Sequence, residues 1–499
     1  MKKLIKKFDI MSNNLTHKKV INNLPLIFFI LLILVFLTRF YSIGIEVIDW
    51  DEADFILMGN SFYQGNLPYL ELWDLKPPVH FFLIGFAFKL FGPSLLVARL
   101  LGAVLVLLSS ILIVLLTKNI LNNFEKFLAA VLYILFVSFE FAQPTMTEFT
   151  AAFFILFSFY CLTKKTHHSY FWSGLLISLA VLTRTNIAFV VLALIIYFYK
   201  YKVPNKKIAT FILGGLIPLT LLMLIYTIEG ALKQFLYSVF VIPLGNTSIR
   251  ENFFDFLSNS FRSIFMDGIF SLQVWFLGLI LFLIINIYKK QKKLSNHFYK
   301  KIPEEIMYNI IILFSLILSI IAGGRFFYHY LIQLFPFISI LLIFMIKNIF
   351  EYKSTIYIIS LLILSINTFS IAQQSINNII NYSEIERNYE IKSFVKHIDN
   401  NQDLLALENH LIYFYTGMGP ITPIVHPNTI TKTAEYEVLL RQLVQLDYIV
   451  DNEFNIILQN KPMYIFCENE CSLYISKKYL REYEIIKQSG DIKLYKKRI

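Results

Sequence analysis

The sequence predicts a polytopic α-helical membrane protein with a small C-terminal α/β domain. Its 499 residues are 57% hydrophobic and only 16% charged, whereas soluble domains carry about a quarter charged residues. Apolar runs of a length that can cross a bilayer as a helix, roughly 20 residues, recur up to residue 372. Beyond that point the chain is less apolar and shows the Gly and Pro punctuation of a globular domain.

The apolar runs predict about eleven spanning helices. The first, residues 24–41, is a mature helix rather than a signal peptide, because acidic residues follow it and no small-residue cleavage site does. The other ten lie near 95–117, 127–143, 147–163, 170–186, 187–199, 208–228, 271–288, 306–322, 329–346 and 355–372.

The charge distribution predicts the topology. The net charge of +11 comes from basic residues that cluster in short loops, which indicates membrane orientation rather than nucleic-acid binding. With a cytoplasmic N-terminus, the inner segments hold 22 Lys and Arg and the outer loops hold six. A crossing by the apolar stretch 79–91 would invert this bias, so we expect a helix there along the outer interface. The loop 42–94 and the tail after residue 372 are then predicted to lie outside the cytoplasmic membrane.

The tail, residues 373–499, has the patterns of one small α/β core. Helical spacing covers 384–400 and the region near 433–446, while "DLLALEN", "PMYIFCEN" and the terminal hairpin "YEIIKQSGDIKLYKK" predict strands. Cys467 and Cys471 stand in "CENEC", and an outer compartment permits a disulfide between them. We favour that disulfide over a zinc site, for which C-x3-C offers too few ligands. Two free thiols are the third alternative.

The outer loop 42–94 concentrates charge beside the membrane, in "DWDEADF" and "WDLKPP". Carboxylates at a membrane are costly unless solvated or paired, and they often mark function, although any outer loop must be polar somewhere. The prolines stiffen the backbone around Lys76. A carboxylate there could take a proton from a hydroxyl, and the lysine could neutralise a lipid phosphate. Asp49, Asp54 and Glu71 are expected to be solvated scaffold.

Several motifs resemble those of a known family. "DE" after the first span, "GNLPY", "WDLKPP" and "LFGPSLLVARL" resemble the GT-C glycosyltransferases of the protein O-mannosyltransferase and aminoarabinose transferase type, with their Rgt-like bacterial branch. "QPTMTEFTAAFFILF", "GLLISLAVLTRTNIAFVVL" and "GGRFFYHYLIQLFPF" resemble later spans of that family in the same order. The resemblance covers about 40–350, with a similar tail. Together with the predicted topology it divides the chain into a basic cytoplasmic N-terminus (1–23), a transmembrane catalytic domain (24–372) and an extracytoplasmic domain (373–499).

The resemblance also implies an activity. These enzymes move a sugar, with inversion, from a polyprenyl-phosphate donor to an acceptor hydroxyl on a glycan, glycolipid or protein at the outer face of the membrane. A hexosyl or mannosyl transfer is the expectation. By matching position, Asp51 is implied as the general base, Glu52 as a group that orients the acceptor or a cation, and Lys76 as the donor-phosphate ligand. Glu148 falls on a second acidic catalytic position, where the family usually has Asp. Arg325, His329 and Tyr330 would line the cavity near the leaving phosphate.

Other charged residues leave alternatives open. Arg250 could clamp a phosphate or be a solvated loop residue. His329 could bind a phosphate or a metal, or simply pack at a span end. Arg184, an intramembrane charge, could be functional or snorkel, and snorkelling is expected of Arg39 and Arg99. No metal site can be assigned, although carboxylates near a phosphate could hold a divalent cation.

Three other functions remain open. One is an outer-face glycan polymerase or ligase that uses diphosphate-linked oligosaccharides. Another is a transporter or flippase of lipid-linked sugars, which would have internal repeats and broken helices. A third is a membrane-anchored binding module whose function lies in the tail. No Walker or G-x-G-x-x-G motif occurs in a suitable context, so the use of nucleotide sugars inside the cell has no support.

Overall fold

The structure, a computed structural model, describes residues 24–245, 302–323, 327–349, 369, 371–431, 436–468 and 471–498. Arg250, Arg325, the span predicted at 271–288 and nearly all of that at 355–372 lie outside the described residues.

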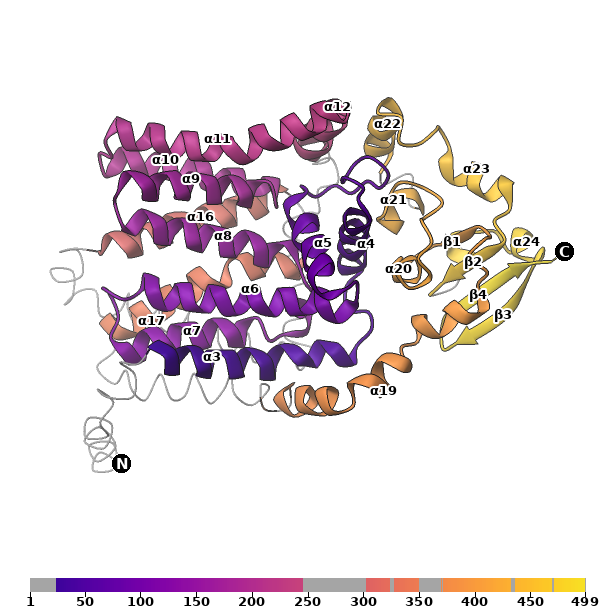
Figure 1. The fold of residues 1–499 in the computed structure, drawn as a ribbon, viewed down its shortest axis with the longest axis horizontal. Helices are drawn as coiled ribbons and strands as arrows, with labels where there is room; N and C mark the ends of the chain where they lie inside the picture. Colours follow the sequence, from indigo (N-terminus) through magenta and orange to yellow (C-terminus); the bar gives the residue numbers. More distant parts are fainter. Residues whose placement is uncertain are drawn as a thin grey trace.

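The described apolar segments form one bundle of helices that run side by side (Figure 1). Within the described residues, four helices are long and apolar enough to cross a membrane, which confirms the membrane class; the count of eleven spans stays a prediction. The bundle helices are α3 (Leu24–Arg39), α6 (Leu95–Leu116), α7 (Asn123–Phe136), α8 (Thr147–Thr163), α9 (His167–Val181), α10 (Ala188–Lys200), α11 (Asn205–Ile228), α16 (Glu304–Gly323) and α17 (Phe335–Ile349).

Two junctions in the bundle differ from the expected spans. The chain between α9 and α10 breaks at a short 3-10 turn, η3 (Thr185–Ile187), so the two adjoining spans are separate helices. The expected span at 329–346 begins as a 3-10 turn, η6 (Tyr328–Gln333), and becomes α-helical only from Phe335. Both turns lie beside the cavity described below.

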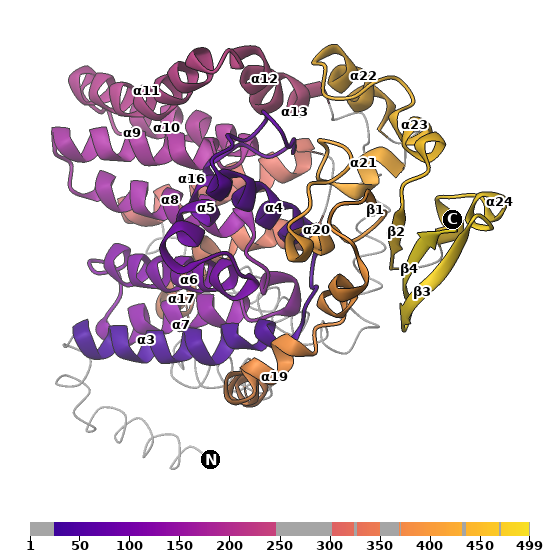
Figure 2. The ribbon, with the colours of Figure 1, turned by 45° about the vertical axis from the view of Figure 1, so that its right-hand side comes forward.

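The outer loop folds into two helices at one end of the bundle (Figures 1 and 2). The helix α5 (Val79–Phe91) was predicted, but α4 (Trp50–Gln64) was not. The carboxylate of Asp49 accepts the Asp51 N–H at 2.9 Å and caps α4, and acidic residues in a first turn complement the helix dipole. Gly65 ends α4 with a φ of 112°, a conformation that glycine adopts without strain.

The C-terminal elements include a four-stranded sheet in the order β1-β2-β4-β3. The strand β1 pairs in parallel with β2, and β4 is antiparallel to both β2 and β3. The strands are β1 (Leu404–Ala406), β2 (Tyr464–Cys467), β3 (Tyr483–Ser489) and β4 (Ile492–Lys497). Each falls within a segment whose pattern predicted a strand, and the hairpin turns at Gly490 with a φ of 50°.

The helices of the tail are short. They are α19 (Tyr382–Arg387), α20 (Leu411–Thr416), α21 (Pro427–Thr431), α22 (Glu437–Gln445), α23 (Glu453–Asn460) and α24 (Lys477–Leu480). The helix expected over 384–400 is interrupted, because the Glu46 carboxylate accepts the N–H groups of Ile391 and Lys392 at 2.7 and 3.0 Å. A separate 3-10 segment, η7 (Ile391–His397), starts at that anchor.

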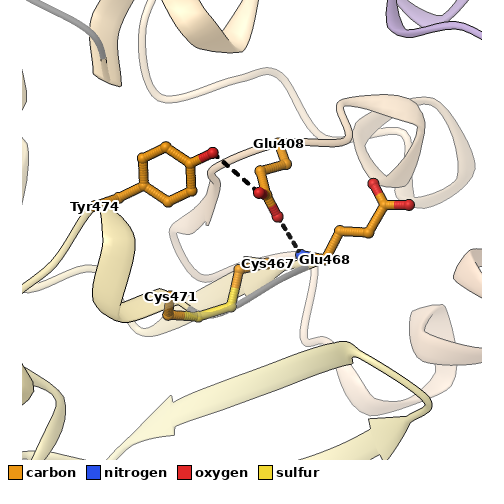
Figure 3. The surroundings of a disulfide bond; sticks show 5 residues. All are labelled: Glu408, Cys467, Glu468, Cys471 and Tyr474. Carbon is orange, nitrogen blue, oxygen red and sulfur yellow. Dashed lines mark hydrogen bonds between the residues drawn. A yellow bond between two sulfur atoms is a disulfide. The ribbon is translucent and has the colours of Figure 1, made fainter. Parts of the chain in front are cut away.

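A disulfide joins Cys467 and Cys471, as the sequence favoured (Figure 3). Beside it, the Glu408 carboxylate accepts the backbone N–H of Glu468 at 2.7 Å and the Tyr474 hydroxyl at 3.0 Å. The disulfide ties Cys471 to the end of β2, and the Glu408 carboxylate holds the backbone of Glu468 next to it.

The tail packs directly against the outer loop. Trp73 forms an isolated parallel bridge with Ile424. The backbone N–H of Trp73 donates to the Pro423 carbonyl at 2.7 Å, and the backbone carbonyl of Trp73 accepts the Val425 N–H at 3.1 Å. The rings of Phe88 in α5 and Phe414 in α20 stack at 5.9 Å. One hydrophobic core runs from the bundle through the loop into the tail, so the boundary at residue 373 stays a prediction.

Candidate functional site

A cavity of about 720 Å³ lies where the outer loop, the bundle end and the tail meet. Its walls come from the outer loop, from the turns η3 and η6 and from the tail, which are far apart in the chain and meet only through tertiary packing. Its ionisable and polar lining residues include Asp49, Asp51, Asp74, Lys76, Arg184, Asn186, His329, Tyr330, His426 and Glu468.

Asp51 and Lys76 face each other in this cavity. Their Oδ2 and Nζ atoms are 3.4 Å apart, and the two side chains are 16% and 21% exposed. Burial alone would raise the pKa of Asp51, but Lys76, then His329 and His426, outweigh it and leave the pKa below its usual range. Burial lowers the pKa of Lys76, yet Asp51 and Asp74 raise it above its usual range. Both groups therefore stay ionised at neutral pH, loosely paired and open to a ligand.

The segment around Lys76 is held rigidly. Its backbone N–H donates to Asp74 Oδ1 at 2.6 Å, and its carbonyl accepts the Tyr69 hydroxyl at 2.6 Å. Burial raises the pKa of Asp74 to about 6 against the opposing effect of Lys76. The Lys76 ammonium lies 5.7 Å from the centre of the Phe55 ring, a geometry that favours a cation. The lysine thus enters the cavity from a fixed backbone.

Glu52, although it follows Asp51 directly on α4, is buried and is not among the residues that line the cavity. Its Oε2 is 2.7 Å from Arg99 Nη2, and both side chains are at most 4% exposed. Its Oε1 also accepts the Thr145 N–H at 2.9 Å. Arg99 donates further to the carbonyls of Ser42, Ile45 and Glu46. The structure therefore places Glu52 in a buried hydrogen-bonded network outside the cavity lining.

The prediction that Arg39 and Arg99 extend their side chains toward the membrane surface is wrong. Arg99 is buried in the network just described, and Arg39 is 3% exposed. Arg39 donates to the carbonyls of Val137, Ala142 and Gln143, which follow the end of α7 and have no helical partners there. Both guanidinium groups donate to buried backbone carbonyls at the end of the bundle next to the loop 42–94.

Glu148 sits below the cavity wall, in the first turn of α8, and is 1% exposed. It pairs with Arg184 Nη1, which also donates to the Thr147 hydroxyl at 2.8 Å. Arg184 itself lines the cavity, with its guanidinium 4.8 Å from the centre of the Tyr330 ring. Glu148 thus orients Arg184, and its carboxylate is not among the cavity lining.

His329 connects these two groups of charges. Its Nδ1 is 3.6 Å from Asp49 Oδ2 and its Nε2 is 3.8 Å from Glu148 Oε1. Burial lowers the pKa of His329, but Glu148 and Asp49 raise it above its usual range. The structure thus brings Asp51, Lys76, His329 and Tyr330 to one cavity, leaves Glu148 just behind it, and separates Glu52 from it.

Sequence reasoning missed one residue of this cavity and the burial of another residue close to it. His426, from the tail, places Nε2 3.7 Å from Asp51 Oδ1; no motif spacing could link residues so far apart. Asp54, expected to be solvated, is 1% exposed, and its position three residues after Asp51 on one helix is the signal that could have revealed it. Arg184, whose role the sequence left open, lies in the cavity wall.

Comparisons with known proteins agree on one fold. Residues 75–245, about a third of the chain, match the family described as dolichyl-phosphate-mannose-protein mannosyltransferase. No curated protein matches the sequence. Among solved structures, ArnT from Cupriavidus metallidurans bound to undecaprenyl phosphate has a TM-score of 0.61 at 12% identity, over 94% of this chain and 97% of ArnT. The apo state of ArnT gives 0.58 at 11% identity, over 91% and 95%. At such identities the likeness concerns the fold, and it spans nearly all of both chains.

Proposed function

We propose that this chain is a GT-C glycosyltransferase that transfers a sugar from a polyprenyl-phosphate donor to an acceptor hydroxyl. Its fold and the family match over residues 75–245 support this proposal. The observation that carries the proposal is the Asp51–Lys76 pair, 3.4 Å apart and open to a cavity of about 720 Å³. The undecaprenyl phosphate bound to ArnT and the dolichyl phosphate in the family description support a lipid-phosphate donor.

The donor phosphate would bind between Lys76 and Arg184. Both cations line the cavity, and a guanidinium held by Glu148 presents fixed donors for phosphate oxygens. Arg250 and Arg325 remain proposed contacts of the same phosphate, from the outer loops that carry them.

The transfer is a single displacement. The acceptor oxygen attacks the anomeric carbon as the bond from that carbon to the phosphate oxygen breaks, which inverts the configuration. The hydroxyl proton passes to Asp51, and the leaving polyprenyl phosphate carries the electron pair, with its charge stabilised by Lys76 and Arg184. A phosphate that draws Lys76 toward itself would leave Asp51 Oδ2 without its partner and ready to accept the proton.

This mechanism revises two roles that the resemblance implied. Glu52 supports the fold through Arg99 and does not orient the acceptor. Glu148 positions Arg184 and does not transfer protons. The donor sugar is proposed to be a hexose, with mannose as the first probe, and the reaction to take place at the outer face of the cytoplasmic membrane.

The test is an assay of the purified full-length protein. Three donors are tested one at a time: undecaprenyl phosphate linked to radiolabelled mannose, glucose or galactose. A cell-envelope glycan extract serves as acceptor. We expect one donor to release undecaprenyl phosphate and to label the acceptor. Consumption of undecaprenyl-diphosphate oligosaccharides alone would indicate a polymerase or ligase instead. Movement of a labelled lipid across vesicles without covalent transfer would indicate a flippase.

A further inference from the structure

A second cavity adjoins the candidate site. It has a volume of about 740 Å³ and shares two lining residues, Val47 and Glu468, with the first cavity. Its walls come from the segment 44–47, from residues between 377 and 391, from the chain after β2 and from the start of β4. Its volume falls in the range of about 300–1,000 Å³ that is usual for small-molecule sites. A ligand that fills it would reach the cavity that holds Asp51 and Lys76.

One helical face forms a polar wall of this second cavity. Residues 371–380 are helical and run into α19 through Asn381, whose N–H donates to the Asn377 carbonyl at 3.0 Å. Four exposed lining residues follow one another at intervals of four, three and four positions: Asn377, Asn381, Glu384 and Asn388. This spacing places side chains on one face of a helix. The wall therefore presents three amides and one carboxylate to a ligand.

The same wall is fixed to the segment that follows α3. Asn378 Nδ2 donates to the Tyr41 carbonyl at 2.9 Å. A Cβ on Gly44 would lie 2.5 Å from the same nitrogen, so a larger residue there would push this amide away. At the other end, the Tyr389 hydroxyl donates to a carbonyl of that segment at 2.6 Å, and Glu46 accepts the two N–H groups that begin η7. The cavity is therefore preorganised, which lowers the cost of ordering it around a ligand.

The two cavities differ in charge. Besides its carboxylates, the first is lined by Lys76, Arg184 and His329, whereas none of the described residues that line the second is Lys, Arg or His. The lining carboxylates of the second are Glu46, Glu384, Glu390 and Glu468. Glu468 Oε2, in the shared wall, is buried without a hydrogen-bond partner among the described residues, and Figure 3 shows this carboxylate pointing away from the disulfide and from Glu408. A phosphate would suit the first cavity and be repelled by the second.

We propose that the second cavity binds a glycan without phosphate or carboxylate groups, as the part of the acceptor next to the reacting hydroxyl. Amides offer hydrogen-bond donors and acceptors, and carboxylates offer acceptors, a combination that matches sugar hydroxyl and amino groups. A glycan lying across Val47 and Glu468 would present its terminal hydroxyl to Asp51. The use of this glycan as acceptor rests on the proposed function, whereas its binding does not.

The experiment measures which glycans the protein binds. Cell-envelope glycans of the organism that encodes the protein are released and separated by anion exchange into an uncharged or basic fraction and an anionic fraction. Each fraction is incubated, over a range of concentrations, with the immobilised full-length protein in a detergent without a sugar head group, and the bound glycans are counted by mass spectrometry. We expect the protein to retain members of the first fraction and to leave the anionic fraction in solution.

A parallel arm distinguishes free from lipid-linked acceptors. It uses the intact glycolipids from which the glycans were released, under the same conditions. Retention of the free glycans as well as the glycolipids would assign the site to the sugar alone. Retention of the glycolipids alone, provided that the variants below weaken it, would assign the site to the sugar of a lipid-linked acceptor.

Variants assign the binding to this cavity. Asn381→Ala combined with Glu384→Ala should weaken retention of the uncharged or basic glycans at least tenfold. Ser383→Ala and Arg387→Gln, at exposed positions of α19 outside the lining, should bind as the unaltered protein does. Glu384→Lys combined with Glu390→Lys should reverse the preference, so that anionic glycans are retained. A merely structural role of these residues would not produce that gain.

Three results would overturn the proposal. The unaltered protein could retain anionic glycans better than uncharged ones, it could retain none, or the Asn381→Ala and Glu384→Ala double variant could bind as the unaltered protein does. The altered residues are exposed, and gel filtration with thermal unfolding checks that each variant is folded. A protein that binds these glycans but transfers no sugar would refute the proposed function alone. Sugar transfer to an anionic acceptor alone would refute this inference and leave the proposed function standing.

Discussion

The two sides of the first turn of α4 differ in how they hold their charges. On the cavity side, Asp51 and Lys76 are partly exposed and 3.4 Å apart. On the bundle side, Glu52 and Arg99 are at most 4% exposed and 2.7 Å apart, with several further hydrogen bonds. Neighbouring residues of one "DE" pair thus belong to two environments.

The difference separates a reactive pair from a structural one. A buried ion pair whose lone pairs are all satisfied loses much when one partner is removed, because the other charge remains buried. A loosely paired, partly exposed charge contributes little to folding but can exchange its partner for a ligand. The comparison therefore predicts opposite consequences for substitutions on the two sides.

The largest effect is expected for Asp51→Asn. Loss of a general base lowers a rate by about 10²–10⁴-fold, and the amide fits the same partly exposed position, so the melting temperature should stay close to that of the unaltered protein. Initial rates of sugar transfer and thermal unfolding measure the two quantities. Glu71→Gln, an exposed carboxylate of the same loop, is the matched control. Full activity of the Asp51→Asn variant would contradict the role of Asp51 as general base.

Next in size is Arg99→Met on the bundle side. It leaves the Glu52 carboxylate buried without its cation, which costs about 3–5 kcal/mol of stability. We expect a markedly lower melting temperature and poor recovery from the membrane. The double variant Glu52→Leu with Arg99→Met should regain part of that loss, since no charge is left unpaired. A single variant as stable as the unaltered protein would contradict the structural role of the pair.

Lys76→Gln should have a smaller, substrate-specific effect. Loss of a charge-assisted contact to phosphate costs about 1.5–3 kcal/mol, or roughly 10- to 100-fold in kcat/KM, and we expect it mainly in the KM for the lipid-phosphate donor. Lys89→Gln, an exposed lysine on α5, serves as control. An unchanged dependence on donor concentration would argue against contact between Lys76 and the phosphate.

The smallest effect is expected at an exposed pair in the tail. Arg441 and Glu437 lie one turn apart on α22, and their side chains are 73% and 62% exposed. Such pairs stabilise a protein by about 0.3–0.5 kcal/mol, so Arg441→Gln should hardly change the unfolding curve, and added salt should abolish the difference. A loss comparable to that of Arg99→Met would show that burial is not what separates the two sides of α4.

The sequence by itself determined the membrane class, the GT-C resemblance, most helix positions, the strands of the tail and the Asp51–Lys76 candidate. These depend on local properties: the length of an apolar run, an alternating pattern, or a motif such as "KPP". The helix α4 escaped prediction because its acidic first turn indicates a polar loop equally well, until Asp49 is seen to cap it.

Only the tertiary structure decided the partners of the charges. Arg99 lies 47 residues from Glu52, and Arg184 lies 36 residues from Glu148, so no local pattern relates them. The roles implied for Glu52 and Glu148, and the snorkelling of Arg99, depended on those unseen partners. His426 joined the site for the same reason: the tail reaches the outer loop through the bridge between Trp73 and Ile424. A sequence specifies which groups can carry charge, but packing fixes which of them lose water and which face a cavity.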